Sequence, residues 1–375
     1  MIYLDNASTT ACDERVVEAM LPYFRTTYGN ASSVDHVSGF FAKRAVDEAR
    51  EVISSLVGAH PEDVIFTSGS TEANNLITSI KRPLSITNIE HASILEPFEL
   101  RDRSDDGFLK VQQNGKLDSE TLRYYLSKSG GGNLVSVIAT NNEVGVEQDV
   151  PSLGAVAFGG GAILHLDGTQ AVLSRSIAMS RSNVDAISLS AHKLYGPKGV
   201  GALVATSRVR RELVPTLRGG GQERGYRSGT LNVPGIIGFA KAVSLLNVSA
   251  GRNHLSTLRY HFLATLKRES SDAIFETVDS NFTSPHILSL RFGRTSTRAL
   301  LNAVNREVSF SLGAACSTNK AEPSKILLAL GIKKDEIART ARLSFSVHQT
   351  VAEVEHAASI IGAASSRLCG MSISA

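Results

Sequence analysis

Lys193 occupies a position in the sequence that would hold an amine still. It follows the strand-like run Val184 to Leu189 and precedes a Gly-Pro turn. A fixed, partly buried amine loses part of its charge, because burial disfavours the ammonium form. A neutral lysine amine can attack an aldehyde and form a Schiff base. For Lys193 considered by itself, a solvated loop lysine is the alternative interpretation.

Three other positions favour the chemical interpretation of Lys193. Asp167 ends the apolar run Ala162 to Leu166, where a carboxylate could keep a pyridine nitrogen protonated. Segment 67–72, Thr-Ser-Gly-Ser-Thr-Glu, joins a strand-like run to a helix-like run, so its N–H groups and hydroxyls would form a phosphate site. His91 follows a further strand-like run and could stack on a flat ring. Together these residues predict a site for pyridoxal 5′-phosphate.

Short polar and glycine-containing motifs occur along the whole chain. In order they are Leu4-Asp-Asn-Ala, Gly29-Asn-Ala-Ser-Ser, Thr67-Ser-Gly-Ser-Thr-Glu, Glu90-His, Asn141-Asn-Glu-Val-Gly, Asp167-Gly-Thr-Gln, Ser190-Ala-His-Lys-Leu-Tyr-Gly-Pro-Lys-Gly, the segment Arg218 to Thr230, and Cys316 followed by Glu322-Pro-Ser. This ordered series resembles the cysteine desulfurases of the NifS/IscS type, from about residue 1 to about residue 360. Any one motif alone would be weak.

The resemblance implies a homodimer that binds pyridoxal 5′-phosphate and removes sulfur from L-cysteine, giving L-alanine and an enzyme persulfide. Its catalytic positions are Lys193, which would move the α-proton, Cys316, which would accept the sulfur, and His91, which would stack on the ring and transfer protons. The positions implied for the cofactor are Ser70, Thr71, His91, Asn142, Asp167, Gln170, Ser190, His192, Lys193 and Thr230. Thr230 would lie in a loop that crosses to the partner subunit. The positions implied for the substrate are Asn142, Arg342 and Asn30.

The composition of the segment around Cys316 bears on the state of its thiol. A single cysteine is by default a small buried apolar residue. Segment 313–323 instead consists of small and polar residues that favour neither a helix nor a strand. It therefore predicts an exposed, mobile thiol that could attack inside a pocket and carry sulfur outwards as a persulfide. The spacing to Glu322 is similar to that of the long-loop, class I members of the family.

Overall composition limits the class of protein. The chain has 375 residues, 42% of them hydrophobic and 20% charged, which is ordinary for a globular protein with two domains. A net charge of +3 over 375 residues is too small to indicate a nucleic-acid-binding protein. No apolar run is long enough for a membrane span. The three cysteines, Cys12, Cys316 and Cys369, have neither metal-ligand spacing nor the number for a disulfide framework. We therefore expect a cytoplasmic enzyme without a metal site.

The elements that must position these residues alternate between strand-like and helical runs. The predicted strands are 64–67, 84–88, 108–112, 134–140, 162–166, 186–189 and 200–205. This alternation predicts an α/β fold, with a mostly parallel seven-stranded sheet sandwiched by helices and a smaller α+β domain. We place the large domain at 14–250 and the small domain at 1–13 and 251–375. Because ligands bind at the carboxyl ends of such strands, the candidate residues should meet in one crevice.

Several helix boundaries can also be predicted. Asp13 is expected to cap one helix that runs to about Thr26, and Ser38 to cap a long helix that ends near Leu56. One helical stretch from Pro234 to about Glu269 would link the two domains. A final helix should run from Val351 to about Ser365 and leave a polar tail.

Other functions fit parts of the pattern. A selenocysteine lyase or another class V aminotransferase-like enzyme would use the same scaffold, although an aminotransferase has no use for Cys316. A non-catalytic sulfur-assembly scaffold or a nucleic-acid-associated component would not need Lys193, Asp167 and Cys316 together. The sulfur acceptor could serve iron–sulfur cluster assembly, tRNA thiolation or DNA phosphorothioation. Because the chain is short after its last predicted helix, we expect a dedicated acceptor protein.

Overall fold

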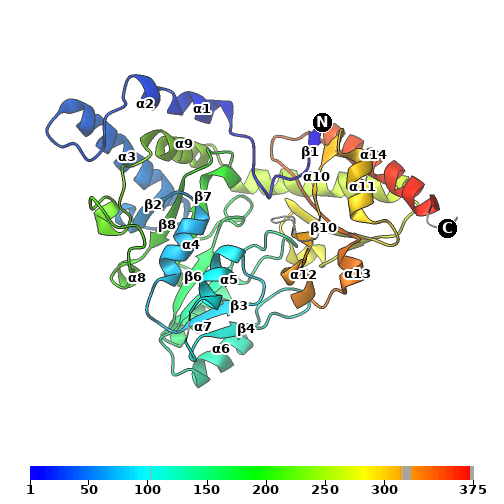
Figure 1. The fold of residues 1–375 in the computed structure, drawn as a ribbon, viewed down its shortest axis with the longest axis horizontal. Coiled ribbons are helices and arrows are strands. Elements are labelled where there is room, and N and C mark those ends of the chain that lie inside the picture. Colours follow the sequence, from blue (N-terminus) through cyan, green and yellow to red (C-terminus); the bar gives the residue numbers. More distant parts are fainter. Residues whose placement is uncertain (102, 313, 316–321, 372–375) are drawn as a thin grey trace.

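A seven-stranded sheet forms the centre of the larger part of the molecule (Figure 1). The computed structural model describes residues 1–101, 103–312, 314–315 and 322–371. The strand order is β2-β8-β7-β6-β5-β3-β4. The strands are β2 (Val64–Thr67), β3 (Leu84–Thr87), β4 (Gly107–Leu109), β5 (Leu134–Ile138), β6 (Ile163–Asp167), β7 (Ala186–Ser190) and β8 (Gly201–Ala205). All pairs from β4 to β7 are parallel, and β8 runs antiparallel to both of its neighbours. The predicted mostly parallel sheet is therefore confirmed.

The strands form where they do because both faces of the sheet are covered. Every residue of β5, β6, β7 and β8 is buried, which explains their nearly continuous apolar sequences. The edge strand β4 is the exception, since Phe108 is exposed. The predicted strand 108–112 is thus too long at its C-terminal end, because β4 ends at Leu109.

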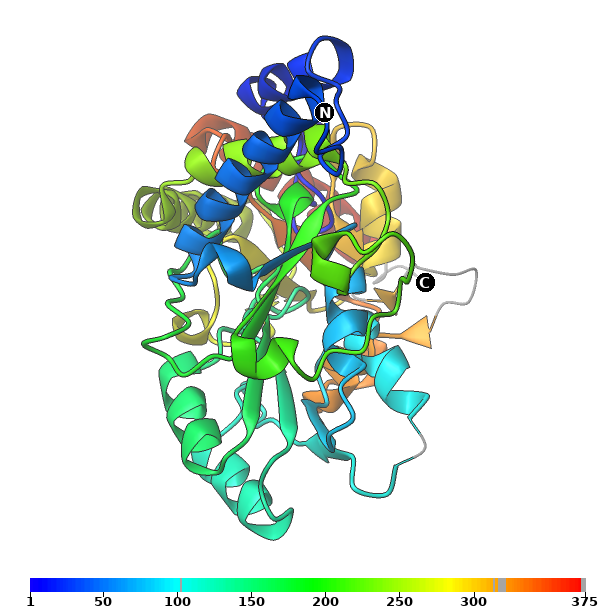
Figure 2. The ribbon, with the colours of Figure 1, turned by 90° about the vertical axis from the view of Figure 1, so that its left-hand side faces the viewer.

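Helices cover the two faces of the sheet separately (Figure 2). On one face, the apolar cluster that contains Val64, Phe66 and Val135 also contains residues of four helices. These are α3 (Val37–Leu56), α6 (Ser119–Lys128), α7 (Val150–Gly159) and α9 (Val233–Ser244). The opposite face, with Ile65 and Leu134, packs on α4 (Ser70–Thr78) and α5 (Ala92–Glu99). Alternate strand residues therefore enter different cores, as the pleat requires.

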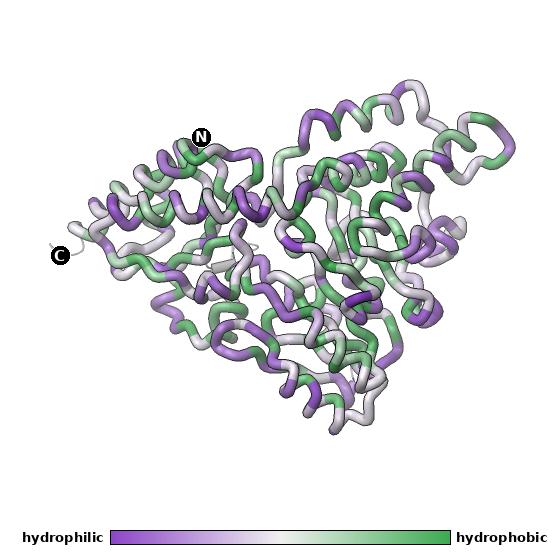
Figure 3. Tube along the Cα trace, turned by 180° about the vertical axis from the view of Figure 1, so that it is seen from behind, coloured by the Kyte–Doolittle hydropathy of each residue, from purple (hydrophilic) through white to green (hydrophobic). Residues whose placement is uncertain are grey.

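A second, smaller antiparallel sheet lies beside the first (Figure 1). Its order is β12-β15-β10-β9, formed by β12 (Ser311–Leu312), β15 (Thr340–Ser344), β10 (Ile287–Phe292) and β9 (Ile274–Glu276). One apolar cluster joins this sheet to α10 (Val248–Glu269), α11 (Thr297–Val304) and α14 (Val351–Met371). In Figure 3 the outer helices alternate between hydrophilic and hydrophobic residues along their length, as helices with one buried side should.

Short elements complete this smaller part. The N-terminal strand β1 (Ile2–Tyr3) pairs in parallel with β11 (Val308–Ser309), so the start of the chain packs against its last third. Strands β13 (Ala314–Ala315) and β14 (Glu322–Pro323) pair with each other, and α12 (Lys325–Ala329) and α13 (Lys334–Ile337) follow. A short α8 (Ser207–Arg210) comes after β8 in the larger part.

Two predicted helix starts need comment. Asp13 does cap a helix, α1 (Glu14–Met20), but the helix does not continue to Thr26: α2 (Pro22–Arg25) follows as a separate element. Pro22 lacks the N–H that a continuous helix would need, which separates the two. The prediction that Ser38 caps α3 is wrong. His36 is the capping residue, and its ring nitrogen Nδ1 accepts a hydrogen bond from the N–H of Gly39.

The predicted stretch from Pro234 to Glu269 is two helices, not one. Helix α9 ends at Ser244, and α10 starts at Val248 with Asn247 as its cap. Within the part of the chain that the structure describes, no single helix has the length and apolar character to cross a membrane. The pair α9 and α10, bent by 74°, meets those two criteria only when taken together. Helix α14 also runs further than predicted, to Met371, and Cys369 in it is buried.

Candidate active site

A cavity of about 360 Å³ lies between the two sheets, at the carboxyl ends of β5 and β6. Its lining residues are Ala7, Ser8, Ser70, Thr71, His91, Ile138, Thr140, Asn142, Asp167, Thr169, Gln170, His192, Lys193 and Arg342. The structure thus brings together nine of the residues that the sequence singled out, from segments up to about 270 positions apart. They meet because parallel strands end on the same edge of a sheet.

Lys193 lies in the cavity wall, in a short 3₁₀ turn that follows β7. Its Nζ donates hydrogen bonds to the carbonyl oxygens of Ala7, at 2.5 Å, and Ser8, at 2.7 Å. Burial, together with the positive charge of Arg342, lowers the pKa of Lys193 to about 8. A neutral amine is therefore accessible near neutral pH, which is the form that attacks an aldehyde.

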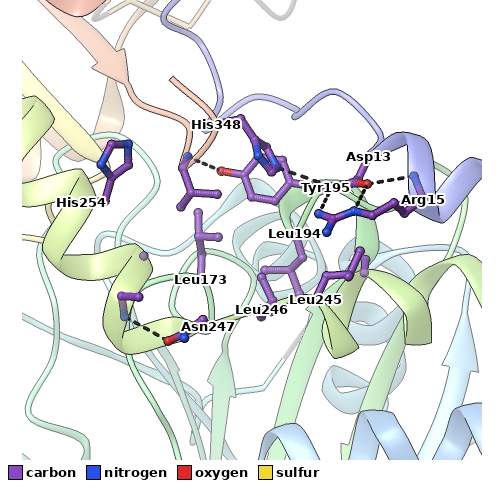
Figure 4. Close-up of a pocket in the computed structure, with 14 residues that line it drawn as sticks. Asp13, Arg15, Leu173, Leu194, Tyr195, Leu245, Leu246, Asn247, His254 and His348 are labelled. Atoms are coloured by element: carbon purple, nitrogen blue, oxygen red, sulfur yellow. Dashed lines mark hydrogen bonds and ion pairs between the residues drawn. The ribbon is translucent and has the colours of Figure 1, made fainter. Parts of the chain in front are cut away.

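Tyr195, two residues after Lys193, anchors the same segment, and Figure 4 shows its surroundings. This residue has a φ of +62°, a conformation that residues other than glycine rarely adopt. Its hydroxyl oxygen accepts a hydrogen bond from the N–H of Val347 at 2.9 Å, and its ring packs edge-on against His348 at 4.5 Å. Its carbonyl oxygen accepts from the N–H of Asp13 at 3.0 Å. The segment that carries Lys193 is thus anchored, through Tyr195, to Asp13 near the N-terminus and to Val347 after β15.

Asp167, the last residue of β6, is buried and has two donors. Its Oδ2 accepts from the side-chain amide of Asn74 at 2.8 Å, and its Oδ1 accepts from the N–H of Thr169 at 3.0 Å. Burial raises the pKa of the neighbouring Glu90 to about 8, and the charge of Asp167 also raises it. Glu90 is therefore mostly protonated at pH 7, so that Asp167 does not face a second carboxylate charge.

The N-terminus of α4 forms a second region of polar groups. Ser70 and Thr71 begin this helix, and an adjoining hollow is lined by both residues together with Ser190 and His192. Burial lowers the pKa of His192 to about 4, and the charges of Lys193 and Lys198 add to this effect. His192 is neutral at pH 7 as a result. Free N–H groups at a helix start, with hydroxyls beside them, suit a phosphate group.

Arg342 of β15 connects three parts of the chain. One terminal nitrogen of its guanidinium donates to the carbonyl oxygen of Asn142 at 2.9 Å. The other donates to Asp5 at 2.7 Å, to Ser8 at 2.6 Å and to Ser311 at 2.9 Å. A carboxylate is thus already one of its partners. A second carboxylate entering the cavity would share the guanidinium with Asp5 or take its place.

Buried polar atoms that lack a hydrogen-bond partner indicate which kind of ligand the cavity can bind. Among the described residues, Thr140 Oγ1, Asn142 Oδ1 and Thr169 Oγ1 are buried without a hydrogen-bond partner, and all three residues line the cavity. Leaving such atoms unpaired is costly, so a polar ligand is expected to contact them. An amine of lowered pKa, a buried carboxylate and a helix start rich in hydroxyls together fit pyridoxal 5′-phosphate.

Four of the residues predicted from the sequence need separate description. Gln170 lines the cavity, and its amide donates to the carbonyl oxygen of Ala7 at 2.8 Å. Thr230 and Asn30 are exposed and are not part of the cavity lining. Cys316 lies outside the residues that the structure describes.

Described residues on either side of segment 316–321 contact the cavity lining or a residue next to it. Ser311 donates a hydrogen bond to Asp5 at 2.8 Å and accepts one from Arg342. On the other side, Ser324 donates to Glu143 at 2.5 Å, and Glu143 follows the cavity residue Asn142. The pairing of Ala315 with Glu322 holds the two ends of the segment next to each other.

Sequence reasoning missed several residues of this site. It noted the motif at residues 4–7 but gave no role to Asp5 or to the carbonyl oxygens of Ala7 and Ser8. Nothing in the sequence near the N-terminus indicates that this motif packs beside Lys193, which is 186 positions away from Ala7. Asn74, Thr140 and Thr169 had a weak signal, since each lies within a few residues of a predicted site residue.

Comparisons with known proteins match this chain to one enzyme family and to relatives named cysteine desulfurase. The class V aminotransferase family matches residues 2–356. The chain is 37% identical over 376 residues to a protein named cysteine desulfurase IscS from Anaeromyxobacter sp. strain Fw109-5, with 96% of this chain and 91% of the relative covered. Among solved structures, it is similar to the NifS-like protein of Rickettsia africae ESF-5, with a TM-score of 0.86, 30% identity, and coverage of 96% and 98% of the two chains. It is also similar to SspA in complex with cysteine, with a TM-score of 0.81, 28% identity, and coverage of 93% and 100%.

Proposed function

The chain belongs to the class V aminotransferase family, and from this premise we propose that it is a cysteine desulfurase that depends on pyridoxal 5′-phosphate. The observation that carries the proposal is the cavity in which Lys193, with its pKa lowered to about 8, lies together with Asp167 and Arg342. The similarity to relatives named cysteine desulfurase supports L-cysteine as the substrate.

We propose that Lys193 attaches the cofactor and that Asp167 contacts its ring nitrogen. Ser70, Thr71, Ser190 and His192 would hold the phosphate, and Gln170 the ring oxygen, as expected from the sequence motifs. The bound cofactor supplies an electron sink for the bonds at the α-carbon of the substrate. His192, neutral at pH 7, would offer the phosphate a ring N–H and no positive charge, beside the N–H groups and hydroxyls at the start of α4.

Substrate binding and proton movement follow from the other side chains. Arg342 would bind the carboxylate of L-cysteine with its planar guanidinium, with Asn142 of the cavity lining assisting. Lys193, once released from the cofactor, removes the α-proton and later returns a proton to carbon. The carbonyl oxygens of Ala7 and Ser8 orient its Nζ for both steps.

Cys316 carries out the sulfur step in this proposal. Its thiolate attacks the substrate sulfur, a sulfur–sulfur bond forms, and the carbon–sulfur bond breaks. The carbon keeps the bonding electron pair and gains a proton, so the products are L-alanine and a persulfide on Cys316, with no external oxidant. The contacts of Ser311 with Arg342 and of Ser324 with Glu143, the neighbour of the cavity residue Asn142, support this assignment.

A homodimer is part of the proposal. Seven large apolar side chains are exposed between Leu21 and Phe41, on α2, on α3 and in the segments beside them, which is typical of a subunit interface. They are Leu21, Phe24, Tyr28, Val34, Val37, Phe40 and Phe41. Thr230 is exposed as well, as expected for a residue that reaches the cofactor phosphate of the partner subunit.

We further propose a cytoplasmic enzyme that passes the sulfur to an acceptor protein. The nucleophile Cys316 must be a thiol, and Cys12 and Cys369 are free, which suits a reducing compartment. The acceptor would serve iron–sulfur cluster assembly, tRNA thiolation or DNA phosphorothioation.

The function is tested by product analysis of the purified enzyme loaded with pyridoxal 5′-phosphate. With L-cysteine and a reductant, it should release alanine and sulfide in equal amounts. Cys316→Ser should abolish sulfide release but keep the change in cofactor absorbance that follows addition of cysteine. Cys12→Ser is the matched control and should keep full activity. A Cys316→Ser enzyme that still releases sulfide would contradict the proposal, and higher turnover with selenocysteine than with cysteine would favour a selenocysteine lyase.

A further inference from the structure

A continuous series of hydrogen bonds connects His91 to Asp167 through two side chains without an assigned role. His91 Nδ1 lies 2.8 Å from the hydroxyl of Ser93. That hydroxyl accepts from the side-chain amide of Asn74 at 2.8 Å, and the same amide donates to Asp167 at 2.8 Å. Ser93, Asn74 and Asp167 are all buried, so water does not compete for these contacts. We call this series the His91–Asp167 relay.

Asp167 sets the direction of the two hydrogen bonds that Asn74 makes in the relay. An ionised carboxylate only accepts, so Asn74 must present its NH₂ group to Asp167. The second hydrogen of this NH₂ group goes to the hydroxyl oxygen of Ser93. The direction of the bond between the Ser93 hydroxyl and His91 depends on the tautomer of the ring, so the backbone N–H of Ser93 decides it.

His91 Nδ1 has two contacts with Ser93. The hydroxyl of Ser93 is one, and the backbone N–H of Ser93, at 3.1 Å, is the other, since His91 is the N-cap of α5. A proton on Nδ1 would point at the N–H of Ser93 and leave two donors opposed. The arrangement is satisfied only by a neutral ring with its proton on Nε2.

We propose that Ser93 and Asn74 are positioning residues that hold His91 as a neutral imidazole with its proton on Nε2. His91 lines the cavity, and Nε2 has no hydrogen-bond partner among the residues that the structure describes. His91 thus offers a hydrogen-bond donor to a ligand and does not serve as a base in the resting enzyme. The catalytic consequence rests on the proposed function, whereas the position of the proton does not.

The two positioning residues differ in what they support. The amide of Asn74 divides its hydrogens between Asp167 and Ser93, so replacing Asn74 disturbs both ends of the relay. Loss of the Ser93 hydroxyl leaves the bond from Asn74 to Asp167 in place and affects His91 alone. Ser93→Ala is therefore the informative variant. Ser93→Thr is its matched control, because threonine keeps the hydroxyl.

The test is the proton position on His91, measured by ¹⁵N NMR of the holoenzyme with labelled histidine. The chain has 10 histidines, and the His91 signals are assigned by their loss in His91→Gln. In the wild-type enzyme and in Ser93→Thr, Nε2 should carry the proton and Nδ1 should not. Ser93→Ala should give a mixture of the two tautomers. Its kcat with cysteine should fall about tenfold while KM changes less than twofold, and Ser93→Thr should restore kcat.

The NMR results test the tautomer of His91 independently of the proposed desulfurase activity. A wild-type enzyme with the proton on Nδ1 would overturn the proposal, as would a Ser93→Ala enzyme that keeps the wild-type tautomer. The NMR measurement needs no turnover of cysteine. If the tautomer is as expected and no desulfurase activity is found, the proton position stands and only the proposed function fails. Circular dichroism of each variant shows whether it is folded.

Discussion

At the scale of single residues, Lys193 shows how position creates reactivity. An ordinary lysine has a pKa of 10.5, whereas burial and the charge of Arg342 bring that of Lys193 to about 8. Asp5 and Asp167 act in the opposite direction, and burial outweighs them. The same side chain on the surface would be almost entirely protonated at neutral pH and chemically inert towards an aldehyde.

The lowered pKa predicts how cofactor uptake depends on pH. Below about pH 8 the amine of Lys193 is mostly protonated, so the rate at which the apoprotein captures pyridoxal 5′-phosphate should fall about tenfold per pH unit. Above about pH 8 the rate should level off, because the amine is already neutral. Stopped-flow absorbance from pH 6 to 10 measures this. The control is free Nα-acetyl-lysine, whose reaction should still accelerate at pH 10; a similar acceleration in the protein would show that Lys193 is not perturbed.

Single residues were also where the sequence was most informative. The meeting of Lys193, Asp167 and His91 in one cavity could be predicted because each lies at or after the end of an apolar strand, and strand ends gather on one edge. Asp5 could not, since its contact with Arg342 spans 337 positions and no local pattern encodes it. Ser93 and Asn74 were missed for a similar reason: their contact depends on how α4 and α5 pack.

At the scale of elements, the loop 218–230 shows how an exposed segment can be held rigidly. Glu223 and Arg224 both have positive φ values, and Glu223 forms a two-point ion pair with Arg50 of α3 at 2.7 and 2.9 Å. Glu223 also accepts from the N–H of Phe66 in β2. Nearer to Thr230, Arg227 pairs with Glu72 of α4 at 2.7 Å. The loop is thus anchored to the large sheet although Thr230 is exposed.

Breaking the buried pair should be costly. In Glu223→Gln, Arg50 keeps its charge with its side chain only 10% exposed, so the free energy of unfolding should fall by about 3 kcal/mol. Urea unfolding followed by circular dichroism measures the change. The matched control is Glu212→Gln, which breaks the ion pair between Glu212 and Arg82. The side chains of this pair are 31% and 28% exposed, so its loss should lower the free energy of unfolding by less than about 1 kcal/mol. Equal losses in the two variants would mean that the burial of Arg50 is unimportant.

Element boundaries were harder to predict than the elements themselves. Ser38 was chosen as the cap of α3 because serine is a good capping residue, but a histidine ring nitrogen fills that role two positions earlier. The bend between α9 and α10 was missed because residues 245–247 do not interrupt the apolar pattern. Asparagine is a good capping residue, so Asn247 was a local signal for the start of α10 that the prediction did not use.

At the scale of the whole molecule, two cores meet at one cavity. The first apolar cluster of the large sheet and the cluster of the small sheet are distinct, and the buried residues Leu255 and Phe262 of α10 belong to the second. On this basis we propose that the domain boundary lies near residue 250. The large domain would span 14–250, and the small domain 1–13 and 251–375.

The proposed dimer can be tested through its apolar surface. Phe40 and Phe41 are 59% and 51% exposed, so a Phe40→Glu, Phe41→Glu double variant should be a monomer in analytical ultracentrifugation, because buried unpaired carboxylates oppose association. It should also bind pyridoxal 5′-phosphate less tightly, since Thr230 no longer reaches a partner. The control, Tyr260→Glu, changes an exposed aromatic residue of α10 and should remain a dimer. A double variant that stays dimeric would place the interface elsewhere.

The pairing of β1 with β11 has a consequence for the order of events on the ribosome. Ile2 finds its strand partner only after Val308 has been translated, and Asp5 must wait for Arg342. A nascent chain that already contains Lys193 therefore still lacks the N-terminal part of the pocket wall in its final place. The reactive amine acquires its complete surroundings only when nearly all of the polypeptide has emerged.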